Sequence, residues 1–243
     1  MAAEGRALIP FTCSTSKAQE RNTMIQLAIF DMAGTTIDER DEVYRILREA
    51  AEREGAKFSD ETFQHYMGTE KHWAIGKLLA EGGIEPTEEI HERAWQWFRE
   101  ELNRSYTAQP PRPLDGIEEL FGNLHERGIK VGLTTGFSRE IVDLILNSMG
   151  WGAEVIDASA AGDEVPSGRP EPFLIQEVMK KLGVTDTSAV ISSGDTHADV
   201  VSAQRAGVTS VGVLTGHLNE EDFVALNADH ILKSAADLLT VLA

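Results

Sequence analysis

The chain has one cysteine, no long apolar run and comparatively few basic residues. Cys13 is the only cysteine among 243 residues, so no disulfide can form within the chain. No stretch approaches the roughly 20 apolar residues that a membrane-spanning helix needs. The 22 basic residues are outnumbered by 40 acidic ones, and the formal net charge of -18 disfavours nucleic acid and anionic membranes as partners. We expect a cytoplasmic protein that binds neither nucleic acid nor membrane.

The bulk composition is that of an ordinary globular protein. Hydrophobic residues make up 42% and charged residues 26% of the chain, which is enough for one substantial core and a smaller accessory unit. The first 23 residues mix charges with short apolar pieces and lack the pattern of a secretory signal. We predict that residues 1–23 form a disordered extension.

The hydrophobic pattern changes twice along the chain. Residues 39–110 repeat apolar positions at three- and four-residue intervals, which predicts helices throughout. Elsewhere short apolar runs alternate with helical patterns, which predicts an α/β fold with a mainly parallel sheet. We therefore predict a core from residues 24–38 and 111–243, with a helical cap at 39–110 inserted after the first strand. The expected strands are Ile25–Phe30, Ile129–Thr134, Val155–Ala158, Ala189–Ser193 and Ser210–Leu214.

An aspartate stands where the first predicted strand ends. Asp31 closes the apolar run, and open α/β sheets place their chemistry at the carboxyl ends of the strands. Gly34 lets the backbone approach a phosphoryl group. Many phospho-hydrolases with an aspartate nucleophile carry a second acid two residues later, which protonates the departing alcohol. Here that position is Ala33, so the site is poorly equipped to release an alcohol.

Three further polar clusters lie at or near predicted strand ends. Thr135 and Gly136 follow the second strand and suit hydrogen bonding to phosphoryl oxygens. Arg169 places a fixed positive charge in a loop before a helix. Asp195 and Asp199 follow another apolar strand and are spaced to bind or orient a hard cation.

With these four regions in this order, the chain resembles the haloacid dehalogenase superfamily of aspartate-nucleophile phosphotransferases. Ala33 and Arg169, the latter where a lysine is usual, are similar to the phosphonatase branch, as is the cap segment from Met67 to Lys71. The resemblance implies a Rossmann-like parallel sheet with a helical cap. It also implies C–P bond cleavage in phosphonoacetaldehyde or a related 2-oxoalkylphosphonate, and a homodimer formed through the caps.

The resemblance also implies a role for each site residue. Asp31 is the expected nucleophile, and Lys71 is expected to form a Schiff base. The phosphoryl group is expected to be bound by Thr35, Thr135, Gly136 and Arg169. A magnesium ion is expected on Asp31, the Ala33 carbonyl, Asp195 and Asp199.

The case for Lys71 also stands on its chemistry. We expect Gly68 or Thr69 to cap a helix, which places Lys71 in the first turn, where the helix dipole and burial favour a neutral amine. An imine between Lys71 and a carbonyl two atoms from phosphorus would accept electrons from the breaking C–P bond. The carbon fragment then leaves as an enamine, and no acid is needed at Ala33.

Three departures from phosphonatase proper bear on the substrate. Ala74 stands where relatives have a histidine, and Met32 and Phe137 replace a tryptophan and a tyrosine. Two alternatives stay open: a phosphatase of small phosphate esters in which Lys71 only binds substrate, and a phosphate-binding module without catalysis.

Overall fold

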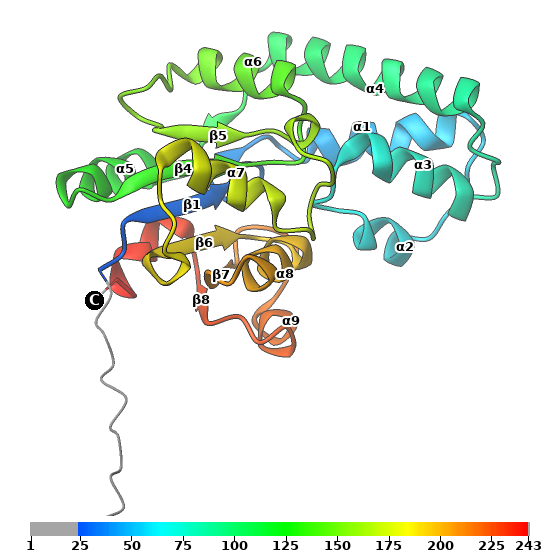
Figure 1. Cartoon of the computed structure of the whole chain (residues 1–243). Coiled ribbons are helices and arrows are strands. Elements are labelled where there is room, and N and C mark those ends of the chain that lie inside the picture. Colours follow the sequence, from blue (N-terminus) through cyan, green and yellow to red (C-terminus); the bar gives the residue numbers. More distant parts are fainter. Residues whose placement is uncertain (1–23, 243) are drawn as a thin grey trace, which may run out of the picture.

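The computed structural model describes residues 24–242, which form a parallel sheet with helices on both faces and a helical unit beyond one edge (Figure 1). The predicted extension at residues 1–23, with Cys13, lies outside the described residues. The six strands of the sheet run in the order β5-β4-β1-β6-β7-β8, and every neighbouring pair is parallel. This confirms the predicted α/β class. The strands are β1 (Leu27–Asp31), β4 (Lys130–Thr134), β5 (Ala158–Ala160), β6 (Val190–Gly194), β7 (Thr209–Val213) and β8 (His230–Leu232).

The central strand β1 is buried on both faces. Its side chains alternate, so that Ala28 and Phe30 join one hydrophobic cluster while Leu27 and Ile29 join another. A strand covered on both sides needs apolar residues at every position, and LAIF provides them. The sheet therefore separates two cores, and Asp31 is the first charged residue that the strand reaches.

The third predicted strand is wrong in its position. We predicted Val155–Ala158, whereas β5 runs over Ala158–Ala160 and pairs with Gly132 to Thr134. The amides of Val155 and Ile156 donate instead to the Gly152 carbonyl in a turn, at 2.9 and 3.0 Å. Apolar character alone does not distinguish a buried turn from a strand.

Helices cover both faces of the sheet. The core helices are α5 (Ile117–Glu126), α6 (Arg139–Met149), α7 (Phe173–Leu182), α8 (His197–Ala206) and α9 (Glu220–Ala225), with short 3-10 helices η1 (Gly162–Glu164), η2 (Thr187–Ala189) and η3 (Ala235–Thr240). Helices α7 and α8 pack on β5, β4, β6 and β7, whereas α5 and η3 lie on the opposite face (Figure 1). None of the helices within residues 24–242 is long and apolar enough to cross a membrane.

Four helices form a separate bundle between two very short strands. β2 (Ile37–Asp38) and β3 (Arg112–Pro113) pair antiparallel, so the chain enters and leaves the bundle side by side. The long last helix buries one residue in every four, Ala94, Phe98, Leu102 and Tyr106, and packs on the first and third helices. The bundle contains α1 (Glu42–Arg53), α2 (Asp60–His65), α3 (Lys71–Glu81) and α4 (Glu88–Ala108).

The bundle stands beyond the carboxyl ends of the strands (Figure 1). Two glycines mark where it touches the core. A Cβ on Gly68 would collide with the Thr196 side chain, and a Cβ on Gly136 would lie 2.5 Å from the Thr69 carbonyl oxygen. The loop before α3 therefore rests directly on the loops that follow β4 and β6.

Candidate active site

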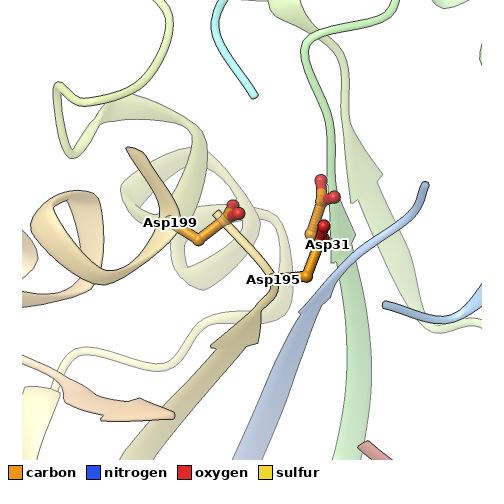
Figure 2. Close-up of side chains that lie close together, drawn as sticks. All are labelled: Asp31, Asp195 and Asp199. Carbon is orange, nitrogen blue, oxygen red and sulfur yellow. The ribbon is translucent and has the colours of Figure 1, made fainter. Parts of the chain in front are cut away.

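Three buried carboxylates converge at the carboxyl ends of β1 and β6. Asp31 is the last residue of β1, Asp195 directly follows β6, and Asp199 lies in the first turn of α8 (Figure 2). One oxygen from each carboxylate lies within 4.8 Å of the others. Because parallel strands end together at one edge, residues 164 positions apart in the chain meet here.

The carboxylate cluster has the chemistry of a cation site. Burial and the neighbouring charge of Asp31 raise the pKa of Asp195 above its usual range. Thr35 counters this in part with a short hydrogen bond, its Oγ1 donating to Asp195 Oδ1 at 2.8 Å. Buried carboxylate oxygens that repel one another are the ligands that a hard divalent cation neutralises. The residues present therefore fit a metal ion.

Gly34 makes this arrangement possible. Its φ of 80° lies in the left-handed region, and a Cβ would stand 2.6 Å from Asp195 Oδ2. The loop after β1 can therefore turn and pass close to the acid only with glycine here. Ala33 lies buried just before it and presents a methyl group where a second acid would stand.

Arg169 bridges two of the acids. Its Nη2 lies 2.6 Å from Asp31 Oδ1, and its Nη1 pairs with Asp199 Oδ1. The other oxygen of Asp199 accepts from the amide of Thr196, at 3.1 Å, and so helps to cap α8. Asp199 thus positions Arg169 with one carboxylate oxygen and caps its own helix with the other.

Hydrogen-bond donors without partners point to an anion. Within residues 24–242, the buried Nε of Arg169 has no hydrogen-bond partner. Thr135 Oγ1 accepts from the Phe137 amide at 3.2 Å, which leaves its hydroxyl proton free to donate. Buried donors normally find acceptors, so this edge suits a phosphoryl group.

Lys71 is buried at the first position of α3, with 3% of its surface exposed. Its Nζ donates to the Thr69 carbonyl at 2.8 Å and would lie 3.3 Å from a Cβ on Gly136. The amine therefore sits against the loop after β4, at the edge that carries the acids. Burial, followed by the charge of Arg169, lowers the pKa of Lys71 to about 8.

The expected cap of this helix is wrong. We predicted Gly68 or Thr69, but Glu70 is the N-cap, and its carboxylate accepts from the amides of His72 and Trp73 at 2.8 and 2.6 Å. Thr69 instead donates its hydroxyl to the Tyr66 carbonyl, at 2.7 Å. A carboxylate satisfies two free amides at once, which a hydroxyl cannot do as well. Lys71 lies in the first turn, as expected.

Two aromatic rings lie beside the amine, and of these only Phe137 was named from the sequence. Lys71 Nζ lies 5.6 Å from the centre of the Tyr44 ring and 6.0 Å from that of Phe137. Glu39 and Tyr106 complete the group, with the Tyr106 hydroxyl donating to Glu39 at 2.9 Å. No spacing rule connects two residues that stand 67 positions apart and meet through the β2–β3 pairing and the packing of α1 on α4.

A cleft of about 1320 Å³ opens between the helical bundle and the sheet edge. Asp195 and Arg169 lie at one wall, and Trp73 and Trp95 line another. Trp73 keeps 46% of its surface exposed, so this wall of the cleft is open to water. A substrate can therefore reach Asp195 and Arg169 from solvent.

The structure brings the predicted residues to one place. The charges of Asp31 and Arg169 act on the Lys71 amine. Thr35 donates a hydrogen bond to Asp195, and Gly136 lies against the Lys71 amine. Thr135 adjoins them through the loop after β4. Their catalytic, phosphoryl-binding and metal-binding roles stay predictions.

Comparison with known proteins agrees with this geometry. The sequence model of a family described as haloacid dehalogenase-like hydrolase matches residues 28–213. A phosphonoacetaldehyde hydrolase from Bacillus cereus is 31% identical over 204 residues, covering 79% of this chain and 76% of the relative.

Solved structures share the fold. A phosphonoacetaldehyde hydrolase-like protein from Oleispira antarctica has a TM-score of 0.77 at 25% identity, covering 90% of this chain and 91% of its own. A predicted phosphoglycolate phosphatase from Haemophilus somnus has a TM-score of 0.74 at 18% identity, covering 90% and 98%. The second likeness concerns the fold alone.

Proposed function

The chain belongs to the haloacid dehalogenase-like hydrolases, and from this premise we propose that it is a magnesium-dependent, phosphonatase-like enzyme. Its proposed substrate is phosphonoacetaldehyde or a related 2-oxoalkylphosphonate. The products are orthophosphate and the corresponding aldehyde or ketone. Membership in a hydrolase family sets aside the alternative of a binding module without catalysis.

The burial of the Lys71 amine beside the acids carries this proposal. Most lysines on a helix extend into water, but this one lies 3% exposed against Gly136, with its pKa lowered to about 8. A lysine that only binds a phosphate gains from keeping its charge. An amine that must attack a carbonyl gains from losing it.

Three carboxylates and one backbone carbonyl are the proposed magnesium ligands. Asp31 and Asp195 supply side-chain oxygens, Ala33 supplies its carbonyl, and Asp199 supports them. When bound, the ion would neutralise negative charge at the phosphoryl group. The raised pKa of Asp195 supports this assignment, because an uncompensated buried pair of acids favours a cation.

In the proposed first stage, Lys71 condenses with the substrate carbonyl. The amine nitrogen bonds to the carbonyl carbon, the carbonyl oxygen leaves as water, and the proton that the ammonium first gave up returns, giving a protonated imine. Arg169 and the hydroxyl of Thr135 hold the phosphoryl oxygens, since both carry donors that point to an anion. Substrate is thereby fixed at both ends.

In the second stage, a carboxylate oxygen of Asp31 attacks phosphorus as the C–P bond breaks. The electron pair of that bond moves into a new C=C bond, and the C=N pair moves to the Lys71 nitrogen, giving an enamine. Protonation of the enamine carbon restores the imine, and one water releases the carbonyl product from Lys71. A second water hydrolyses the aspartyl-phosphate to orthophosphate.

The missing acid at Ala33 fits this route. An alcohol leaving from a phosphate ester must take up a proton, whereas an enamine leaves with its electrons already delocalised onto nitrogen. The helical bundle would act as a cap, excluding water from the imine until phosphorus has been transferred. The close contacts at Gly68 and Gly136 support a closed arrangement.

Reductive trapping tests the proposal. We expect borohydride in the presence of phosphonoacetaldehyde to add a two-carbon group to Lys71, found by peptide mass mapping, in an enzyme that also releases phosphate. Lys71→Arg keeps the charge but should lose both labelling and turnover. An unchanged rate of phosphate release in Lys71→Arg would instead assign the chain to the ester phosphatases.

A further inference from the structure

One buried acid has no place in the route above. Glu39 is 3% exposed and lies on the segment that leads from β2 into the helical bundle. Its Oε2 accepts from the Val43 amide at 2.8 Å and from the Tyr106 hydroxyl at 2.9 Å. Within residues 24–242 no hydrogen bond engages its Oε1. Half of the carboxylate is therefore fixed and half is available.

Glu39 is linked to the surroundings of the Lys71 amine through two aromatic side chains. Tyr106, its hydrogen-bond donor, packs edge-on against Phe137 with ring centres 6.3 Å apart. Phe137 and Tyr44 in turn lie 6.0 and 5.6 Å from Lys71 Nζ. Two aromatic rings thus lie beside the amine, and Glu39 is linked to one of them, Phe137, through Tyr106.

A small second cavity adjoins this group. It measures about 200 Å³ and is lined by Glu39, Tyr44, Gly34 and Asp195 among other residues. A polar cavity of this size has room for several water molecules, each of which needs two to four polar partners. Asp195 also lines the larger cleft, so both hollows reach the acid edge. Tyr44, one of the lining residues, has its ring centre 5.6 Å from Lys71 Nζ, so water in this cavity would offer a proton path from Glu39 toward the amine.

We propose that Glu39 is the acid-base partner of Lys71, which takes a proton from the amine and returns one as the imine forms and is hydrolysed. This inference rests on the proposed function, since it gives Lys71 a partner for that chemistry. Ala74, one turn along α3 from Lys71, offers no titratable group for the task.

The proton balance closes without any further reagent. The Lys71 ammonium gives one proton to the Glu39 carboxylate, leaving a neutral amine and a carboxylic acid. The amine adds to the carbonyl carbon, and the nitrogen proton passes to the former carbonyl oxygen. Glu39 then returns its proton to that hydroxyl, which leaves as water while the protonated imine forms. The pair begins and ends as one cation and one anion.

The electrostatic surroundings favour such an exchange. Burial raises the pKa of Glu39 and lowers that of Lys71 to about 8, so the two affinities for a proton approach each other. Lys71 is faced by Arg169 from the core and by the carboxylates of Asp31, Glu70 and Glu39. Tyr106 and Asp41 face Glu39 besides Lys71 itself.

The first test needs no substrate. The pKa of Lys71 is measured in the full chain from the pH dependence of its acetylation by acetic anhydride, read by peptide mass spectrometry. We expect Glu39→Gln to lower that pKa, because it removes a negative charge that stabilises the ammonium. Glu88→Gln, the same change at an exposed position of α4, should leave it unchanged. An unchanged pKa in Glu39→Gln would overturn the inference.

The second test measures the step itself. We expect Glu39→Gln to slow borohydride-trapped imine formation by about 100-fold, the lower range for general acid-base catalysis, although more of its amine is neutral. Glu39→Asp should restore part of the rate. Tyr106→Phe removes only a hydrogen bond to Oε2 and should cost less than tenfold. An equal or faster rate in Glu39→Gln would overturn the proton-exchange role.

The two proposals can fail separately. If the wild-type chain is never labelled at Lys71, the proposed function fails whatever Glu39 does. If the wild-type chain is labelled and Glu39→Gln is labelled at the same rate, only the inference about Glu39 fails. Thermal unfolding of each variant shows that a slow variant is still folded.

Discussion

The two halves of the candidate site manage charge in opposite ways. At the sheet edge, Arg169 neutralises part of the charge of three acids directly, with 2.6 Å between Arg169 Nη2 and Asp31 Oδ1. At the bundle, a single amine lies among aromatic rings, and its nearest hydrogen-bond acceptor is the neutral Thr69 carbonyl. The first half holds charge for binding and attack. The second half disfavours the charged ammonium form of Lys71, which suits an amine that must become neutral to react.

Asp31→Asn separates the halves with the largest expected effect. Phosphate release should fall by about 10⁴-fold or more, because the nucleophile is lost. Reductive labelling of Lys71 should persist, since the amine belongs to the other half. The loss of a carboxylate that raises the pKa of Lys71 makes the amine more often neutral.

The same borohydride assay and a phosphate assay measure both effects. Lys71→Arg is the matched opposite, losing label and turnover together. Loss of labelling in Asp31→Asn, in a folded protein, would show that the two halves do not act separately.

Gly136→Ala should weaken the contact between the halves. The new Cβ would lie 2.5 Å from the Thr69 carbonyl oxygen, so the bundle must shift away from the sheet edge. Misplacing a reactive group by about 1 Å can cost 100-fold, and we expect a fall in kcat/KM approaching that size. Steady-state phosphate release measures it.

Gly122→Ala is the control for that substitution. Gly122 lies within α5, and nothing stands within 4 Å of its added Cβ. Alanine there should keep full activity and stabilise the helix by about 0.5 to 1 kcal/mol. Equal kcat/KM in both variants would mean that the close approach at Gly136 does not matter.

The pH dependence of turnover sharpens the contrast. Lys71 has a pKa of about 8, and only its neutral form attacks a carbonyl. In Glu39→Gln no neighbouring carboxylate takes the ammonium proton, so kcat/KM should rise about tenfold per pH unit up to the Lys71 pKa and then level off. In the wild type Glu39 takes that proton, so the rise below the Lys71 pKa should be much shallower, and hydrolysis of p-nitrophenyl phosphate, which needs no imine, should show none. Equal profiles for the phosphonate in the wild type and Glu39→Gln would contradict the proton exchange.

The sheet edge could be predicted from the sequence, whereas the surroundings of Lys71 could not. Asp31, Thr135 and Asp195 each follow an apolar run, and parallel strands bring their carboxyl ends together whatever the loops do. Lys71 was predicted from a local segment, but Tyr44 lies beside it, and Tyr106 reaches Glu39, because α1 packs on α3 and α4. Contacts made by helix packing follow no regular spacing in the sequence, so they could not be predicted from it.

Small elements were missed for a related reason. Strand β8 is only three residues long, all of them half-buried, and helix α9 is only six residues long. Neither is long enough to show a recognisable hydrophobic period in the sequence. Glu70 displaced Gly68 and Thr69 as helix cap because its carboxylate reaches two amides. Which of several neighbouring residues caps a helix depends on the local backbone geometry, and the sequence alone does not give that geometry.

The smallest expected effect concerns stability, and it tests whether burying the Glu39 carboxylate destabilises the folded protein. Burial raises the pKa of Glu39 in the folded chain, so its contribution to stability is full below its ordinary value of 4.5 and is lost as pH rises through the folded value. In Glu39→Gln, the new side-chain amide would still accept from the Val43 amide and the Tyr106 hydroxyl without a buried charge.

Glu39→Gln should therefore be more stable than the wild type at pH 9, by about 0.5 to 2 kcal/mol, and gain less at pH 5. At pH 9 most of the Lys71 amine is neutral, so little is lost by removing its carboxylate neighbour. Urea unfolding at the two pH values measures the difference. A variant that is less stable at pH 9 would mean that Glu39 serves the fold, and a gain in stability joined to a slower imine step would mean that it serves the reaction.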